Sequence, residues 1–146
     1  MFILSAYLQK YKLPAKFATL KKRSDMTTQE VADKYVILFR QGDSALIQRE
    51  MYSNEVVCRE PEHATAIGVA THTEGLEAVM AKSKAFAEKI EEVHSFYCSD
   101  PVVATGHFSV SMGRELTFKN GPRIKRDEIA VFGVKDDKIV SETFFY

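Results

Sequence analysis

Apolar positions recur at helical spacing soon after residue 25 and predict two helices in succession. Thr27 and Glu30 have the spacing of a capping box, which marks a helix start. The apolar residues that follow at intervals of three and four are Val31, Tyr35, Leu38 and Phe39. Gly42 ends this first helix, and the polar residues directly after it can cap a shorter second helix through Met51.

The middle of the chain predicts one strand and a third helix. The strand covers Glu55–Glu60 and ends at Pro61, and residues 61–72 are expected to form a loop. The third helix, from about Glu74 to Glu91, has the clearest pattern in the chain because a charged face lies beside one apolar stripe. That stripe consists of Leu76, Val79, Met80, Phe86, Ala87 and Ile90.

In the second half of the chain the apolar period changes to two, which is typical of strands. Asn120–Pro122 marks a turn, and Asp136–Asp137 forms a two-residue hairpin connection. The predicted order is ααβαββββ, an α+β fold in which helices pack on one face of an antiparallel sheet. The four strands are Val93–Ser99, Val102–Met112, Arg123–Val134 and Lys138–Phe145.

Length and composition fit one globular domain without a metal or disulfide framework. The 146 residues can bury a core of their own, and 45% of them are hydrophobic without any run long enough to span a membrane. Cys58 and Cys98 are far apart and lack a CxxC or Cys/His cluster, so both are interpreted as buried thiols. His63, His72 and His107 are scattered and predict no metal site. No cofactor is expected, since phosphate-binding and dinucleotide fingerprints are absent from the sequence.

Charge divides the chain into two parts. Residues 1–25 carry a net charge of +5, and residues 26–146 carry −5, which disfavours nucleic acid as the main partner. Residues 1–25 are expected to be a basic extension, either outside the fold with a natural start at Met26, or an arm that contacts a membrane or partner. The apolar start lacks the features of a secretory signal, so the cytoplasm is the expected location. Arg123–Arg126 is interpreted as a solvated basic face.

The element order and three segments resemble the nuclear transport factor 2-like superfamily and its SnoaL-like branch. These segments are Thr28–Gln41, Glu74–Lys84 and Asp127–Tyr146, of which the last, DEIAVFGVKDDKIVSETFFY, is the most specific. The resemblance covers residues 26–146, and Asp137 departs from it because relatives often carry Gly there.

This resemblance implies a cystatin-like cone, a curved antiparallel sheet wrapped around about three helices. Its open end would hold an apolar small molecule, and two copies would pair through their sheets as a homodimer. Members include isomerases, polyketide cyclases, dehydratases, hydrolases and non-catalytic binding modules, so the fold alone does not identify a reaction. No membrane or nucleic-acid partner is implied.

Candidate chemistry centres on carboxylates that the strands turn inward, because a carboxylate in an apolar cavity can transfer protons near neutral pH. Alternation places Glu128 on one face with Ala130 and Phe132, which is taken as the inner face. The resemblance to the SnoaL-like branch also supports placing Glu128 on the inner face of the strand. The alternative is that Glu128 only neutralises Arg123, Arg126 or another nearby base.

His94 and Glu60 are the other catalytic candidates. His94 falls on one strand face with Phe96 and Cys98, and a His94–Glu128 pair would relay a proton. The alternative for His94 is a hydrogen-bonded core or rim histidine. Glu60 ends a strand before Pro61, near the position of the general base in the isomerase branch that the chain resembles, but an exposed strand-end glutamate is the commoner outcome.

Substrate contacts are expected from Tyr35, whose hydroxyl can donate to a substrate oxygen, and from residues on the inner strand faces. The latter are Phe96, Phe132, Glu142 and Phe144, with Tyr146 on the same face of the last strand. Two function classes remain open. One is an isomerase, cyclase or dehydratase acting on an apolar carbonyl compound, and the other is a non-catalytic dimeric binding module.

Overall fold

The computed structural model describes residues 26–146, and the predicted basic extension over residues 1–25 lies outside them. Within residues 26–146, three α-helices and a 3-10 helix accompany seven strands. The helices are α2 (Thr28–Arg40), α3 (Ser44–Met51), η2 (Glu62–Ile67) and α4 (Leu76–Glu88). The strands are β1 (Tyr52–Arg59), β2 (His72–Glu74), β3 (Ile90–Cys98), β4 (Val102–Ala104), β5 (His107–Phe118), β6 (Arg123–Lys135) and β7 (Lys138–Phe145).

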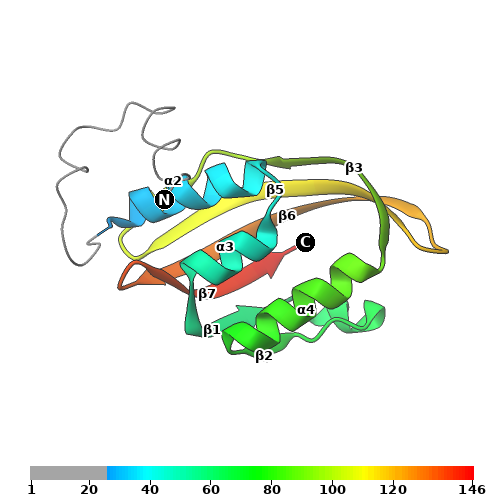
Figure 1. Cartoon of the computed structure of the whole chain (residues 1–146), viewed down its shortest axis with the longest axis horizontal. Helices are drawn as coiled ribbons and strands as arrows, with labels where there is room; N and C mark the ends of the chain where they lie inside the picture. Colours follow the sequence, from blue (N-terminus) through cyan, green and yellow to red (C-terminus); the bar gives the residue numbers. More distant parts are fainter. Residues whose placement is uncertain (1–25) are drawn as a thin grey trace.

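The strands form one curved sheet, and α2, α3 and α4 lie before the same face of it (Figure 1). The order across the sheet is β2-β1-β7-β6-β5-β3, with β4 pairing the same edge of β5 as β3. The predicted α+β cone is therefore confirmed. One pairing differs from the antiparallel prediction, because β1 and β7 run parallel. These strands come from opposite ends of the described chain, so no tight turn constrains their relative direction.

The expected strand over residues 102–112 is wrong, since the chain reverses within it. Thr105 and Gly106 form a turn, Gly106 adopts φ 74°, and β4 folds back onto the start of β5. Only glycine takes this left-handed conformation at little cost. Because a two-residue turn preserves the alternation of apolar residues, the period of two continued through it and concealed the reversal.

Helix α2 contributes buried apolar residues to the core, as its pattern predicted. The capping box is present, with Thr27 Oγ1 accepting from the Glu30 backbone and Glu30 Oε2 accepting from the Thr27 backbone. Its apolar side packs on the sheet, where the Tyr35 ring lies 4.5 Å from that of Phe132 and 5.6 Å from that of Phe108. The second helix is also confirmed, with Asp43 as its cap.

Helix α4 is shorter and more exposed than its pattern predicted. It starts after Gly75, which adopts φ 87°, and it ends at Glu88 because β3 takes over the chain from Ile90. Val79 is the buried residue of its stripe, while Phe86 is half-buried. The helix therefore borders the inner face of the sheet at one end and leaves most of its own surface exposed. None of the helices in residues 26–146 is long and apolar enough to cross a membrane.

Candidate functional site

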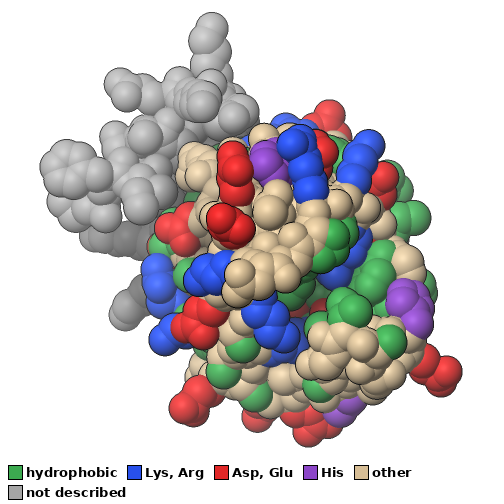
Figure 2. All heavy atoms as spheres, turned by 90° about the vertical axis from the view of Figure 1, so that its right-hand side faces the viewer, with side chains coloured by type: hydrophobic (Ala, Val, Ile, Leu, Met, Phe, Trp, Pro, Cys, Tyr) green, Lys and Arg blue, Asp and Glu red, His purple; other side chains and the backbone are tan. Residues whose placement is uncertain are grey.

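A small recess lies on the inner face of the sheet where the last turn of α4 meets β5 and β6. Its cavity volume is about 10 Å³, room for roughly one water molecule. We call it the inner recess and define it by its lining residues, Phe86, Arg114, Leu116, Ile124, Arg126 and Glu128. Figure 2 views the molecule from this end, where basic side chains border hydrophobic ones.

A separate open groove runs along α4 and β1. It has a volume of about 520 Å³ and is lined by Asn54, Leu76, Glu77 and Met80. Glu77 is the one ionisable side chain among these lining residues, and it lies on the exposed side of α4. The inner recess therefore concentrates more of the chemistry that a site requires.

Glu128 points inward, as the alternation of β6 predicted. It is 8% exposed, and Ala130 and Phe132 on the same face are fully buried. Arg126, two residues earlier on that face, donates from Nε and Nη2 to Glu128 Oε2 at 2.9 and 2.8 Å. The alternative role, neutralising Arg126, is therefore part of the observed geometry.

Arg126 itself corrects the interpretation of residues 123–126 as a solvated basic face. Its guanidinium lies 4.0 Å from the Tyr146 ring centroid and 5.7 Å from that of Phe86. Only the odd-numbered residues Arg123 and Lys125 are exposed, because strand alternation turns the even ones toward the helices. Arg126 thus fixes Glu128 against an aromatic wall.

Glu60 lies at the end of β1 in a second ion pair. Lys82 Nζ of α4 donates to Glu60 Oε1 at 2.8 Å, and the Tyr146 hydroxyl donates to Oε2 at 3.0 Å. The Glu60 side chain is 8% exposed, so the expectation of an exposed strand-end glutamate is wrong. Lys82 also donates to Cys58 Sγ at 2.8 Å. Burial lowers the pKa of Lys82, but its hydrogen bonds to Cys58 and Glu60 outweigh burial and raise the pKa overall.

Glu142 is the most deeply buried carboxyl group that the structure describes, at 4% exposure. Burial raises its pKa, against the opposing effect of hydrogen bonds from Tyr52 and Cys58. The Tyr52 hydroxyl donates to Glu142 Oε2. Burial is also the main reason why the pKa of Cys58 rises to about 12 and that of Tyr52 rises well above its usual value. Burial therefore favours the protonated form of each of these three groups.

These contacts join the polar groups of the interior into one series. It runs from Glu142 through Cys58 and Lys82 to Glu60 and Tyr146, and the Tyr146 ring lies against Arg126, which binds Glu128. The strands β1, β6 and β7 and the helix α4 each contribute to it. Glu60 and Glu128 each have a cation at 2.8 Å, and Glu142 accepts a hydrogen bond from the Tyr52 hydroxyl.

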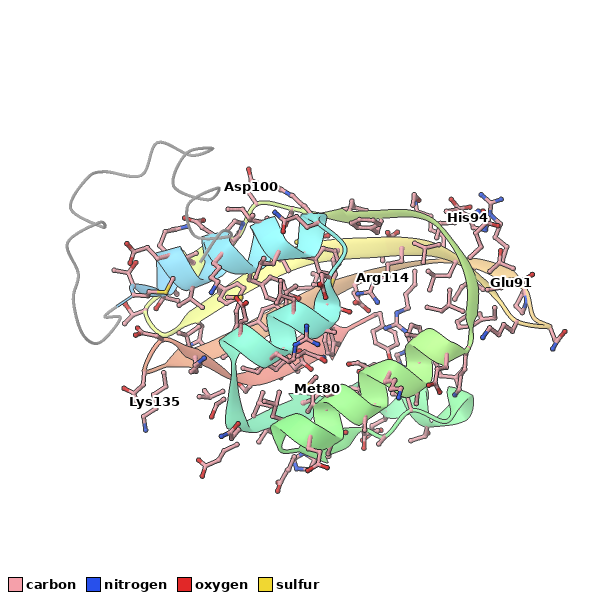
Figure 3. All side chains as sticks on the ribbon, in the orientation of Figure 1. Met80, Glu91, His94, Asp100, Arg114 and Lys135 are labelled. Atoms are coloured by element: carbon pink, nitrogen blue, oxygen red, sulfur yellow. The ribbon has the colours of Figure 1, made fainter. Side chains whose placement is uncertain are left out.

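His94 lies on the other face of the sheet. The β3–β5 register shifts between Val93 and Ser95, so His94 falls in a bulge, and its Nε2 lies 2.7 Å from Thr117 Oγ1. Thr117 alternates away from the buried Leu116 of the inner recess. The expected common face with Phe96 and Cys98 is therefore wrong, and the structure does not bring His94 to Glu128. In Figure 3 His94 lies at the outer bend of β3.

The expected substrate contacts divide between core and rim. Tyr35 and Phe132 pack against each other in the core, and burial raises the pKa of Tyr35 well above its usual value. Phe96 is 44% exposed and meets the Phe39 ring edge-on at 6.1 Å. Phe144 is half-buried against the core. None of these four lines the inner recess.

Arg114 and Lys82 were not candidates from the sequence, and Arg126 was assigned to a solvated face or to the neutralisation of Glu128. Arg126 shares the parity of Glu128, which was the available signal. Arg114 pairs with Arg126 in the β5–β6 register, but a register is not readable from one strand. Lys82 did not stand out in the sequence because its helix carries several other charged residues. Among residues 26–146, no group of three or more His, Cys, Asp or Glu side chains is arranged to hold a metal ion.

Comparison with known proteins identifies relatives of the whole described region. Residues 26–146 match the family model of the SnoaL-like domain. A structure from Mesorhizobium loti, provisionally assigned as a SnoaL-like polyketide cyclase [carbohydrate phosphatase], is 30% identical and has a TM-score of 0.76. The match covers 83% of this chain and 100% of that one. No curated protein matches the chain.

Two further structures share the fold at lower identity. One, from Xanthomonas campestris, has a cystatin-like fold, 19% identity and a TM-score of 0.67 over 82% of this chain and 90% of that one. The other, from Catenulispora acidiphila, has a ketosteroid isomerase-like fold and was solved with trimethylamine. It is 15% identical with a TM-score of 0.62, over 83% of this chain and 87% of that one.

Proposed function

Since the chain belongs to the SnoaL-like domain family, a fold associated with small-molecule binding, we propose that it binds an apolar carbonyl compound at the inner recess and transfers a proton on it. The observation that carries this proposal is the inward carboxylate of Glu128, held by Arg126 among apolar side chains. Isomerases, cyclases and dehydratases all use such a step.

The proton transfer follows from the two groups that the recess holds together. Glu128 takes a proton from the carbon next to the ligand carbonyl, and the electrons of that C–H bond form an enolate. The negative charge on the oxygen is stabilised by the Arg126 guanidinium, which is already oriented at 2.8 Å from Glu128. Glu128 then returns the proton to the same or another carbon.

Glu60 has a positioning role in this proposal. Its carboxylate holds Lys82 and the Tyr146 hydroxyl, and the Tyr146 ring stacks under Arg126 at 4.0 Å. His94 has no role in it because its ring binds Thr117 on the opposite face of the sheet. The reaction is therefore assigned to the Arg126 and Glu128 pair.

A non-catalytic binding module is the second candidate, and two observations favour it. Glu128 and Glu60 both have a cation of this chain at 2.8 Å, so each carboxylate already has a structural partner. The recess has room for about one water molecule in this conformation. In that function the same residues orient a ligand without changing it.

Turnover of a panel of enolisable ketones, followed by deuterium exchange at the carbon next to the carbonyl, distinguishes the two functions. The catalytic proposal predicts exchange by the wild type and a loss of about 100-fold or more in Glu128→Gln. Glu62→Gln, on the exposed 3-10 helix, is the matched control and retains exchange. Binding without exchange would support the binding module, and exchange that survives Glu128→Gln would refute the role of Glu128.

We also propose a homodimer formed through the outer face of the sheet. Ile129 and Phe145 pair across β6 and β7 and are 52% and 55% exposed, and Tyr97 on the same face is 44% exposed. Burying such side chains in a second copy would remove apolar surface from water. Light scattering should then give twice the chain mass, and Ile129→Lys should return the monomer. A wild type that is monomeric at every concentration would contradict this assembly.

A further inference from the structure

We infer that the inner recess recognises a singly charged carboxylate of its ligand through Arg114. This inference rests on the proposed binding of a small molecule there and specifies the chemical class of that molecule. It depends on the placement of Arg114, a residue that the proton transfer does not use. In Figure 3 Arg114 lies on the side of the sheet that faces the helices.

Arg114 and Arg126 stand directly opposite each other on β5 and β6, and both line the inner recess. Like charges at directly opposed positions on one face of a sheet destabilise it. Glu128 neutralises Arg126, through two hydrogen bonds to one oxygen. The recess therefore contains two guanidinium groups and one carboxylate, and that carboxylate is bonded to Arg126.

Arg114 itself has an aromatic contact in place of an acidic partner. Its guanidinium lies 5.4 Å from the centroid of the Phe39 ring. Among residues 26–146, no carboxylate oxygen lies within the 4.0 Å ion-pair distance of Arg114. Glu142 is engaged elsewhere, because its carboxyl group accepts a hydrogen bond from the Tyr52 hydroxyl. Lys82 and Glu60 cancel each other.

Arg114, Arg126 and Glu128 together give the inner recess one excess positive charge, which fits a ligand that carries one negative charge. A half-buried guanidinium presents its N–H donors in a planar fork that matches the two oxygens of a carboxylate. Glu128 in the same recess would repel a dianion such as a phosphate monoester, so the smaller charge is favoured.

The apolar side chains that line the inner recess indicate the chemistry of the rest of the ligand. Phe86, Leu116 and Ile124 are apolar, and the recess has room for about one water molecule. One carboxylate oxygen would therefore occupy the recess, and the aromatic or aliphatic body of the ligand would lie outside it against α4.

Binding of naphthalene-2-carboxylate and of its neutral amide, naphthalene-2-carboxamide, measured by calorimetry with the full chain, tests this inference. The wild type should bind the acid at least about tenfold more tightly than the amide, a preference that corresponds to ~1.4 kcal/mol. Arg114→Gln should abolish the preference and leave the affinity for the amide unchanged. Lys125→Gln removes a positive charge from the exposed face of β6 and should keep the preference.

Each outcome decides one claim. Equal affinities for acid and amide in the wild type, or a preference that survives in Arg114→Gln, would overturn the carboxylate inference while small-molecule binding stands. Binding of neither compound would overturn the proposed recess and this inference together. A preference without deuterium exchange on the ketone panel would support the carboxylate site and refute only the catalytic step.

The urea midpoint of Arg114→Gln should not fall below that of the wild type, since the substitution removes the repulsion from Arg126.

Discussion

Lys82→Met removes the cation that holds Glu60 and keeps a side chain of similar length. Lys82 Nζ lies 2.8 Å from Glu60 Oε1, and the two side chains are 20% and 8% exposed. After the change the Glu60 carboxylate stays largely buried, with the Tyr146 hydroxyl at 3.0 Å as its remaining partner. Cys58 also loses its contact with Lys82.

The expected cost lies between the values for buried and exposed ion pairs. Removing one partner of a fully buried pair costs about 3–5 kcal/mol, and exposed pairs contribute about 0.2–1 kcal/mol. Because Lys82 is one-fifth exposed and Tyr146 still donates to Glu60, we expect a loss of about 2–3 kcal/mol in the free energy of unfolding. That is a large part of the roughly 5–15 kcal/mol that stabilises a typical domain.

Urea unfolding at pH 7, followed by circular dichroism, measures this loss. With a slope of about 1.5 kcal/mol per M, the midpoint should fall by roughly 1–2 M. Lys84→Met, an exposed change on the same helix, is the control and should leave the midpoint nearly unchanged. In a double-mutant cycle with Glu60→Gln, the coupling should be about 1–2 kcal/mol. If Lys82→Met and Lys84→Met unfolded at the same urea concentration, this account of the ion pair would be wrong.

Two further changes probe the interior and the sheet. Burial raises the pKa of Glu142, so the folded protein keeps this proton to a higher pH than the unfolded chain, and wild-type stability decreases as pH rises from 4.5 through the raised folded pKa. Glu142→Gln should therefore narrow the difference in urea midpoint between pH 5 and pH 8, and an undiminished difference would exclude Glu142 as its source. Gly113→Ala places a methyl group against the Tyr97 ring and the Asp127 carboxylate and should cost about 1–3 kcal/mol. Thermal unfolding of the double variant with Tyr97→Ala should recover part of that loss, and no recovery would point to another cause.

The alternation of β6 carried the most reliable information about the candidate site. It placed Glu128, Ala130 and Phe132 on the buried face before any contact was known. The same parity applied to Arg126, but its charge favoured the interpretation as a solvated face. Alternation gives the direction of a side chain, and its partner depends on what the neighbouring strand places opposite it.

His94 shows where alternation fails. One extra residue in β3 shifts the register between Val93 and Ser95 and turns His94 to the face of Thr117. A bulge is specified by pairing with β5, a strand that begins well after it in the chain. No pattern within residues 93–99 could therefore reveal it.

The sequence by itself determined the helix capped at Thr27, the second helix after Gly42, the closing hairpin and the inward direction of Glu128. Caps, turns and alternation depend on residues that are close together in the chain. Only the tertiary structure decided the parallel β1–β7 pair, the small volume of the recess, and the meeting of Lys82, Glu60 and Tyr146. These depend on the curvature of the sheet and on how α4 packs against it. Distances between remote segments follow from the packing of the whole chain, which local periodicity does not encode.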